Sequence, residues 1–453
     1  MKDLRKLLWL YLILLIFEGA LRKWIIPALD APLLIIRDPL VIWIYMVARQ
    51  QGLSFENAFF KPNLFLAIAS GLASTFFGSG RLAVTVYGLR TDFLQIPLIF
   101  LIPQIINRND VVAMGKFILR VTLPITLLVL LQFRSSPDDW VNKGAFRTHY
   151  GTVRPSGTFS FIPGLVAFYA MVASFVFYGF VRVRIYPIWL VTSVTFMLLL
   201  GSSVSGSRSC LVSVGIVAAT AVICVVIRGK GGFGLMIGAV VISLLVPLLS
   251  FVPAFNDGYK QLMQRFGDAG YVEGGTSGFV DRYADTMLGP LALMEEADLF
   301  GSGLGLGTNA GQALMMGGRT TKFVNGSENE WGRVIYEGGP IFGFLFIILR
   351  LAITLAIFKS AFDALRRNNP LPMLIFAGCG LLIFNGQWGV PTTLGFAIFG
   401  GGLALAACVE PEEHEEEEEE SEDEEHEDHE DGEHENEHDG ADEDHSAESG
   451  RVA

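Results

Sequence analysis

The chain has 453 residues, 51% of them hydrophobic, and a formal net charge of −13 at pH 7. The charge is unevenly divided. Residues 410–453 carry 25 acidic side chains against one arginine, a net of −24, whereas residues 1–409 carry 32 basic against 21 acidic side chains, a net of +11. A basic body with apolar runs at residues 7–17, 111–131 and 339–349 excludes an acidic soluble protein and indicates an integral membrane protein.

Hydropathy predicts an all-α polytopic membrane protein with about twelve transmembrane helices. The first is predicted to be a retained helix and not a signal peptide, because no small-residue cleavage site follows residues 1–6, and Glu18, Arg22 and Lys23 interrupt the apolar region. The predicted spans cover residues 7–24, 31–48, 61–78, 91–107, 111–132, 160–181, 185–201, 209–228, 232–251, 339–358, 371–386 and 390–408.

Basic residues set the expected orientation, because loops on the cytoplasmic side of a membrane are enriched in lysine and arginine. An N-terminus and a C-terminus in the cytoplasm place the following residues at cytoplasmic ends: Lys2, Arg5, Lys6, Arg49, Lys61, Arg108, Arg182, Arg184, Arg228, Lys230, Lys359, Arg366 and Arg367. Three polar segments then lie outside, at residues 133–158, 201–209 and 252–338. The last contains helix-like stretches at about 258–266 and 281–299 and predicts a partly helical loop.

Residues 410–453 are predicted to form a disordered, acidic, cytoplasmic tail, because their composition cannot bury a core. The tail holds six of the seven histidines, so weak binding of divalent metal or of a partner is the alternative. The body contains only His149 and no metal-ligand spacing, which predicts a site without metal. The cysteines Cys210, Cys224, Cys379 and Cys408 all lie in apolar stretches and are expected to be buried thiols.

Cationic side chains collect in the predicted outer segments. They are Arg147 and Arg154 before the sixth span, Arg208 at the end of the turn at 205–209, Arg282 after Asp281, and Arg319 and Lys322 in the large loop. Guanidinium groups from separate elements are suited to a diphosphate, because each offers a planar fork of donors and stays charged. The alternative for each one is an interfacial anchor or an ion pair.

The large loop also contains a glycine-rich passage at residues 301–308 and a predicted helix start at residues 327–330. The passage follows no strand and lacks a Walker lysine, which excludes nucleotide binding and predicts close backbone approach or a flexible turn. A lesser alternative is that its amides help to hold a sugar or phosphate. The pattern Ser327-Glu328-Asn329-Glu330 predicts a capping box near Glu328, and Pro340 is expected to bend the helix.

Glu328 has two interpretations. It is a first-turn acid favoured by the helix dipole, or a general base toward an acceptor hydroxyl. Arg333 and Glu337 are four residues apart on the same predicted helix and are expected to pair with each other.

Together these features resemble the O-antigen ligase and O-antigen polymerase superfamily of bacterial envelope glycosyltransferases. The matching features, in order, are the segment Arg-Pro-Ser-Gly-Thr-Phe at 154–159, the Ser-Gly-Ser-Arg turn ending at Arg208, Asp281-Arg282 before the glycine-rich passage, and Asn329 before Glu337-Gly338-Gly339 and Gly343. Residues 17–24, Phe-Glu-Gly-Ala-Leu-Arg-Lys-Trp, resemble a sequence near the N-terminus of some uncharacterised members.

The resemblance implies transfer of a glycan from undecaprenyl diphosphate to a sugar hydroxyl of an acceptor glycan or glycolipid, on the outer, periplasmic face of the bacterial cytoplasmic membrane. The transfer would proceed by direct displacement with inversion. It would take place in the lipid bilayer and would need no metal, cofactor, nucleotide or nucleic acid. The implied catalytic residues are Glu328, Arg208 and Arg282, and those that bind the diphosphate or glycan are Arg147, Arg154, Arg319, Lys322 and Asn329.

Two alternatives stay open at this point. Ligases of the family usually carry a His-Asn pair where this chain has Glu328-Asn329, so a polymerase of O-antigen or exopolysaccharide, or a ligase for another acceptor, fits as well. A polysaccharide or solute transporter would place ionisable residues in mid-span, often in broken helices. Arg37 and Asp38 are the clearest such pair in the sequence, and the collection of other polar candidates on one side favours an enzyme.

Overall fold

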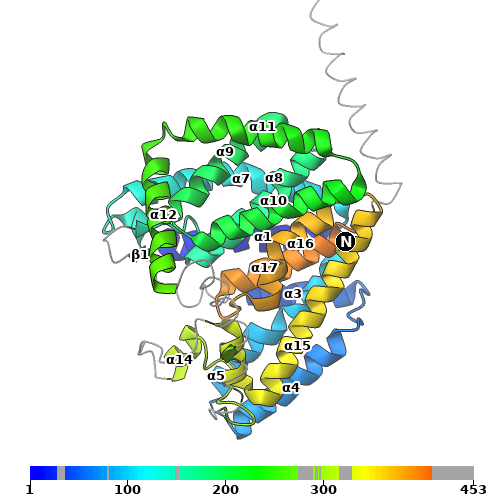
Figure 1. Cartoon of the computed structure of the whole chain (residues 1–453). Coiled ribbons are helices and arrows are strands. Elements are labelled where there is room, and N and C mark those ends of the chain that lie inside the picture. Colours follow the sequence, from blue (N-terminus) through cyan, green and yellow to red (C-terminus); the bar gives the residue numbers. More distant parts are fainter. Residues whose placement is uncertain are drawn as a thin grey trace, which may run out of the picture. The chain divides into compact units, whose positions relative to one another are not determined.

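The structure, a computed structural model, describes residues 1–27, 36–78, 81–143, 145–147, 153–273, 289–290, 294, 297–315 and 329–410. Side chains are described for these residues except 146–147 and 268–273. Helices dominate the described residues (Figure 1). The two short strands β1 (Phe146–Arg147) and β2 (Val153–Arg154) pair antiparallel. The prediction of an all-α fold is confirmed.

The helices of the first half follow the predicted spans with one clear difference. The span expected at 91–107 begins nine residues earlier, at Leu82, because the charges of Arg90 and Asp92 are buried in ion pairs and do not end the helix. The elements are α1 (Lys2–Ala20), the π-helical turn η1 (Leu21–Ile25), α3 (Arg37–Gln50), α4 (Phe60–Phe76), α5 (Leu82–Leu89), η3 (Arg90–Leu94), α6 (Ile96–Leu101), η4 (Ile102–Gln104), α7 (Arg108–Arg134) and η5 (Trp140–Asn142).

The second half contains longer helices and the described parts of the large loop. The elements are α8 (Ile162–Val181), α9 (Ile188–Val204), α10 (Arg208–Arg228), α11 (Gly232–Leu249), α12 (Pro253–Glu273), α14 (Asn309–Met315), α15 (Glu330–Arg366), α16 (Leu371–Asn385) and α17 (Pro391–Ala406). The turn expected at 201–209 is shorter than predicted, because α9 continues to Val204. The Ser203 hydroxyl donates to the Leu199 carbonyl inside this last helical turn.

Several of these helices are apolar enough for a membrane protein. Six helical stretches among the described residues have the length and composition to cross a bilayer: Leu82–Gln104, Arg108–Arg134, Ile162–Val181, Arg208–Arg228, Gly232–Leu249 and Glu330–Arg366. The helices α9, α16 and α17 are apolar but shorter. Each of the twelve predicted ranges overlaps a helix. The number of about twelve spans itself stays a prediction.

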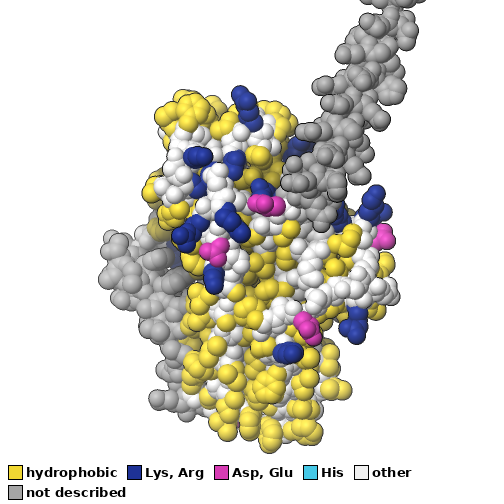
Figure 2. Space-filling view, turned by 90° about the vertical axis from the view of Figure 1, so that its right-hand side faces the viewer, with side chains coloured by type: hydrophobic (Ala, Val, Ile, Leu, Met, Phe, Trp, Pro, Cys, Tyr) yellow, Lys and Arg dark blue, Asp and Glu magenta, His cyan; other side chains and the backbone are white. Residues whose placement is uncertain are grey.

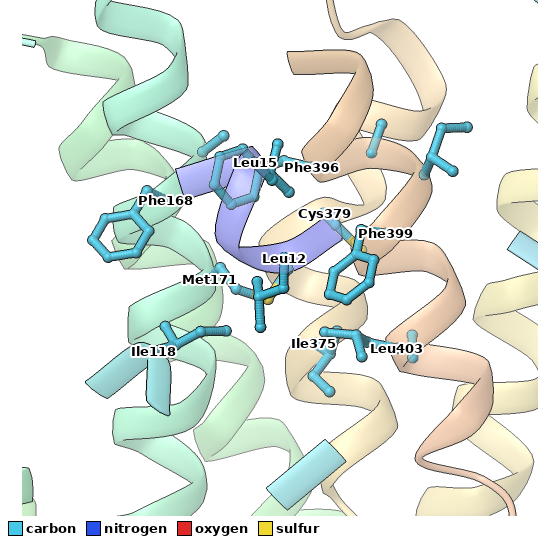
Figure 3. Packing of buried hydrophobic residues seen from close by; sticks show 14 of the residues in the cluster. Leu12, Leu15, Ile118, Phe168, Met171, Ile375, Cys379, Phe396, Phe399 and Leu403 are labelled. Atoms are coloured by element: carbon cyan, nitrogen blue, oxygen red, sulfur yellow. The ribbon is translucent and has the colours of Figure 1, made fainter. Parts of the chain in front are cut away.

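The core forms where α1, α7, α8, α16 and α17 meet (Figure 3). Leu12 of α1, Met171 of α8 and Phe399 of α17 are all buried there. Glycine lets the helices approach closely, as is common between membrane helices. A β-carbon at Gly400 of α17 would lie 2.7 Å from Cβ of Cys379 and 2.9 Å from Cε of Met171. The described cysteines are free, and those other than the partly exposed Cys408 are buried, as expected.

One end of the bundle, here called the N-terminal end, collects basic residues from several helices. Arg5 Nε lies 3.6 Å from Asp110 Oδ2, and both Arg182 and Arg228 donate to Asn368, which follows α15. Figure 2 is seen from the side on which the N-terminus lies in Figure 1 and shows lysine and arginine gathered on its upper part above a largely hydrophobic lower part. The structure thus groups basic residues that the sequence placed on one side.

The opposite end is crossed by α12, and is here called the α12 end. Figure 1 shows α12 running across the direction of α8 to α11, beside β1. A β-carbon at Gly258 would lie 2.9 Å from Val204 Cα, so α12 packs directly on the end of α9. The helix predicted at 258–266 is confirmed, and it is longer, spanning Pro253–Glu273.

The second loop helix, predicted at 281–299, falls mostly outside the described residues. Residues 289–290 within it are helical, whereas residues 297–300 at its end form bends and turns. The Gly301 N–H donates to the Asp298 carbonyl at 2.8 Å and closes a turn, and the Phe300 ring stacks on Phe77 of the segment after α4. The predicted acidic tail, apart from Glu410, also lies outside the described residues.

Candidate functional site

Three of the predicted site residues have described side chains: Arg154, Arg208 and Asn329. Arg147 is described only through its backbone, which pairs with Val153 in the β1–β2 hairpin, next to Arg154. The other predicted site residues lie outside the described residues, and these are Glu328, Arg282, Arg319 and Lys322.

Arg154 lies on β2 with a half-buried side chain. Its Nε is buried and has no hydrogen-bond partner among the described residues. Burial, and then the positive charge of Arg265 on α12, lower the pKa of the Arg154 guanidinium to about 10. Because this value is still well above 7, the group keeps its charge at neutral pH. A cation with an unused buried donor and a like charge nearby can receive an anion. Arg228, next to Arg182 at the N-terminal end, shares these two features.

Arg265 connects this hairpin to the turn that carries Arg208. Its Nη1 donates to the Gly206 carbonyl at 2.7 Å, and Arg208 begins α10 two residues later. Arg154, Arg208 and Arg265 are here called the hairpin cluster. The structure therefore places a third arginine, which sequence reasoning missed, near Arg154 and in contact with the turn that leads to Arg208. The signal was present in the predicted helix at 258–266, where Arg265 follows Lys260 by five residues.

An open cavity of about 520 Å³ adjoins the hairpin cluster. Val153, which precedes Arg154 on β2, is part of its wall, and α12 supplies most of its polar lining. Arg134 Nη2 lies 3.5 Å from Asp257 Oδ2 at its edge, and both side chains are half-exposed. The lining residues are Phe133, Arg134, Ser135, Pro137, Val153, Asp257, Lys260, Gln261 and Gln264. Amide, carboxylate and cationic groups around one aromatic ring are well suited to sugar hydroxyls.

Asn329 begins α15 as its N-cap, with its Oδ1 accepting from the Trp331 N–H at 3.1 Å. The helix thus starts at Glu330 and not near Glu328. The expected capping box is not formed as predicted, because the Glu330 carboxylate does not turn back to the backbone. It is buried and binds two arginines, and this ion pairing replaces the capping role.

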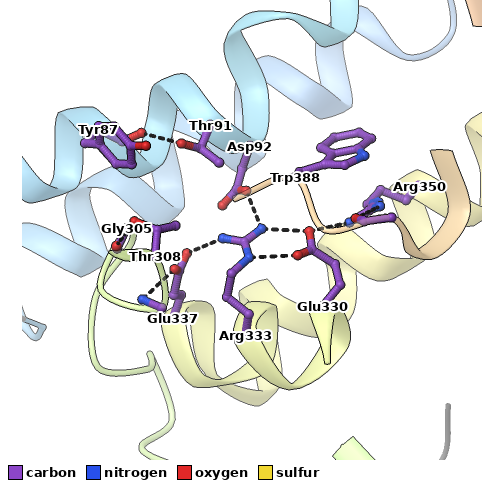
Figure 4. A network of polar contacts seen from close by, with 12 residues as sticks. Tyr87, Thr91, Asp92, Gly305, Thr308, Glu330, Arg333, Glu337, Arg350 and Trp388 are labelled. Atoms are coloured by element: carbon purple, nitrogen blue, oxygen red, sulfur yellow. Dashed lines mark hydrogen bonds and ion pairs between the residues drawn. The ribbon is translucent and has the colours of Figure 1, made fainter. Parts of the chain in front are cut away.

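Those contacts belong to a buried set of charges, here called the Arg333 network (Figure 4). Arg333 binds Glu337 at 2.8 Å, Asp92 of η3 at 2.7 Å and Glu330 at 2.9 Å, and Arg350 binds Glu330 at 2.7 Å. The Arg350 guanidinium also lies 4.0 Å from the Trp388 ring centre. The expected pairing of Arg333 with Glu337 is confirmed, and Arg333 has two further carboxylate partners, Asp92 and Glu330.

The helix α15 is broken beside this network, as Pro340 predicted. Gly339 has φ +67° and ψ −176°, and Pro340 has no N–H to donate to the Tyr336 carbonyl. The glycine-rich passage replaces the lost bonds, because Ser302 N donates to Tyr336 O at 2.9 Å and Gly303 N donates to Glu337 O at 3.1 Å. The prediction of close backbone approach by the glycine-rich passage is therefore confirmed.

A second buried set of charges involves α1 and α3. Arg37 Nε donates to Glu18 Oε2 at 2.8 Å, and Asp38 accepts from Arg90 and, at 2.9 Å, from Gln95. Arg37 and Asp38, the pair singled out in the sequence, are thus both buried, and each is paired with residues of other segments. The sequence did not predict these pairings, because the partners come from separate segments, and each charge is tolerated because it is paired.

No protein-family model matches the chain, and no curated protein is detectably similar to it in sequence. Among the described residues, no group of three or more His, Cys, Asp or Glu side chains is arranged to hold a metal ion. The functional conclusion therefore depends on the geometry of the hairpin cluster and its cavity.

Proposed function

We propose that the chain is a membrane glycosyltransferase of the O-antigen ligase type, which moves a glycan from undecaprenyl diphosphate to an acceptor sugar hydroxyl at the outer face of a bacterial cytoplasmic membrane. The observation that carries the proposal is the hairpin cluster, in which Arg154 presents an unused buried donor next to Arg265. Like charges held together are costly unless an anion joins them. A lipid diphosphate supplies two adjacent phosphates at this position.

The α12 end would then face the periplasm, and the N-terminal end would face the cytoplasm. The basic residues of the N-terminal end support this orientation. The diphosphate would lie near the start of α10, and the sugars attached to it would occupy the cavity between β2 and α12.

In the proposed reaction, the acceptor hydroxyl oxygen attacks the anomeric carbon of the donor sugar. The bond from that carbon to the diphosphate oxygen breaks, and its electron pair leaves on undecaprenyl diphosphate. Arg154, Arg208 and Arg265 stabilise the added negative charge. The hydroxyl proton passes to a base, a role assigned to Glu328. Arg147, Arg282, Arg319, Lys322 and Asn329 stay predicted contributors to binding or catalysis.

The test compares bacterial cells that lack the protein with cells complemented by wild type, Arg154→Ala or Arg366→Ala. Arg366 is exposed at the N-terminal end, far along the chain from the hairpin cluster, and serves as the control for loss of one arginine. Envelope polysaccharide is examined on gels, and carrier-linked glycan is extracted and sized. We expect glycan transfer to fail in the null and Arg154→Ala cells and to be normal with Arg366→Ala.

The species that accumulates identifies the reaction. Full-length polymer left on the carrier identifies a ligase, and single repeat units identify a polymerase. If neither carrier-linked species changes, the glycosyltransferase proposal is wrong.

One observation favours a transporter as the second candidate function. The break in α15 at Gly339 lies beside buried charges, and broken helices with ionisable groups are features of secondary transporters. Its weakness is that all the arginine nitrogens shown in this network are used by partners. Uptake or export by proteoliposomes that is abolished by Arg333→Lys but unchanged by Arg154→Ala would favour the transporter.

A further inference from the structure

The least expected contact near the hairpin cluster is made by η1, the π-helical turn that follows α1. Arg22 and Lys23 lie in the π-helical turn η1, where they interrupt an apolar sequence, and each is only 8% exposed. They are therefore not basic anchors reaching toward water. Single π-helical turns are frequent at functional sites, because the wider turn redirects side chains.

Lys23 directs its ammonium group to one short segment, residues 156–159, here called the 156–159 turn. Its Nζ donates to Ser156 Oγ at 2.7 Å, to the Gly157 carbonyl at 3.5 Å and to the Phe159 carbonyl. A lysine ammonium has three donors, and all three are accounted for here. No carboxylate among the described residues pairs with it. The ammonium group therefore binds only the hydroxyl and carbonyl oxygens of this turn.

Gln132 of α7 holds the same turn from the other side. Its Oε1 accepts from the Gly157 N–H at 2.8 Å and from the Ser156 N–H at 3.2 Å, and its Nε2 donates to the Gly157 carbonyl at 3.2 Å. Gly157 has φ +59°, a conformation that favours glycine. Two side chains from two helices thus fix a turn whose glycine would otherwise leave the backbone flexible.

The contact between α1 and this segment is also close in the backbone. A β-carbon at Gly19 would lie 2.5 Å from the Ser160 nitrogen, and Arg22 Nη1 donates to Ser160 Oγ at 2.9 Å. The Thr158 hydroxyl donates to the Ile16 carbonyl at 2.8 Å. The sequence motif at residues 17–24 is therefore the partner of the motif at residues 154–159.

We infer that Lys23 and Gln132 are positioning residues for Arg154, which they hold in place through the 156–159 turn. Arg154 is two residues before this turn and has no hydrogen bond from its own Nε among the described residues. Its backbone is held by the pairing of β2 with β1 on one side and by the 156–159 turn that follows it on the other. The inference rests on the proposed function, because it takes Arg154 as a ligand of a lipid diphosphate.

The test measures binding of farnesyl diphosphate to the purified full-length protein in lipid nanodiscs. The variants are Lys23→Met, Arg154→Ala and the double variant. Lys143→Met is the matched control, because Lys143 is an exposed lysine of the same outer segment. We expect Lys23→Met and Arg154→Ala each to weaken binding by about tenfold or more. The double variant should be no weaker than Arg154→Ala alone, and Lys143→Met should bind like wild type.

A merely structural role for Lys23 would give a different pattern. It would lower the fraction of protein able to bind without changing the affinity of the rest, or its effect would multiply with that of Arg154→Ala. Either result, or wild-type affinity in Lys23→Met, overturns the inference. Failure of wild type itself to bind farnesyl diphosphate overturns the proposed function instead, which separates the two failures.

If Lys23→Met does not fold, Ser156→Ala removes one contact of the ammonium and leaves the other two. Gln132→Glu keeps the two acceptor bonds to the N–H groups, loses the donations to the Gly157 and Val141 carbonyls and adds a negative charge. Both are expected to weaken farnesyl diphosphate binding by a smaller factor than Arg154→Ala. Wild-type affinity in both variants would contradict the positioning role.

Discussion

The Arg333 network and the hairpin cluster each bring arginines together from separate helices, but their charges are balanced differently. Arg333 and Arg350 are buried among three carboxylates, Asp92, Glu330 and Glu337. Arg154 has a second arginine beside it and an unused buried donor. Buried charges with complete sets of partners maintain a fold, whereas a guanidinium with one unused donor beside another cation is suited to a ligand of opposite charge.

The largest expected effect on the free energy of unfolding comes from a change in the Arg333 network, whose charges are balanced. Arg333→Ala leaves Asp92, Glu330 and Glu337 buried with too few cations, which costs about 3–5 kcal/mol in the free energy of unfolding. The change is measured by denaturation in mixed micelles, with Arg366→Ala as the control. A loss below about 1 kcal/mol would contradict a structural role and leave the network open to a functional one.

Gly339→Ala tests the broken helix that brings the glycine-rich passage to the Arg333 network. A β-carbon there would lie 2.5 Å from both the Asp298 carbonyl and the Gly301 nitrogen, in a left-handed conformation. We expect a loss of about 2 kcal/mol or more in the free energy of unfolding. Gly52→Ala is the matched control, because Gly52 has φ +76° and no atom within 4 Å of the added carbon.

Gly52→Ala should therefore show only the backbone strain, about 1–2 kcal/mol. Equal losses in both variants would mean that contact with the glycine-rich passage contributes nothing to stability.

Asn329→Ala removes the cap of α15 and should lower the free energy of unfolding by about 1 kcal/mol. Asn107 caps α7 at the N-terminal end with a full capping box, so Asn107→Ala is a control of similar size. If Asn329→Ala also lowers glycan transfer well beyond Asn107→Ala at matched stability, Asn329 has the substrate role that the sequence resemblance implies.

The smallest expected effect on stability is that of Arg154→Ala. Removing one of two like charges relieves repulsion from Arg265 and breaks no ion pair among the described residues, so the free energy of unfolding should change by less than about 0.5 kcal/mol. A loss as large as that of Arg333→Ala would show that Arg154 is structural and would remove the contrast between the two regions.

Local patterns in the sequence predicted much of the helical framework. Apolar runs located the helices, Pro340 located the break in α15, and the spacing of four residues predicted the pair Arg333–Glu337. The segment that begins at Arg154 and the turn before Arg208 were also recognised as candidate sites, but the β1–β2 pairing was not predicted. These features depend on neighbours within a few residues.

The remaining contacts could not be predicted because they depend on tertiary packing. Arg333 reaches Asp92, 241 residues away, and Lys23 reaches Ser156, 133 residues away. Arg265 belongs to the hairpin cluster only because α12 crosses the ends of α9 and α10. The sequence marked Arg22 and Lys23 as unusual in an apolar helix, but nothing local identified the turn that they hold.

Glycan transfer by purified protein in proteoliposomes, with lipid diphosphate-linked donor and a sugar acceptor, tests the central claim most directly. We predict that Arg154→Ala lowers the transfer rate by about 10²- to 10³-fold, the loss typical of removing one group that stabilises a developing negative charge. Arg366→Ala should transfer glycan at the wild-type rate. Equal rates for Arg154→Ala and wild type would contradict the assignment of the hairpin cluster as the diphosphate site.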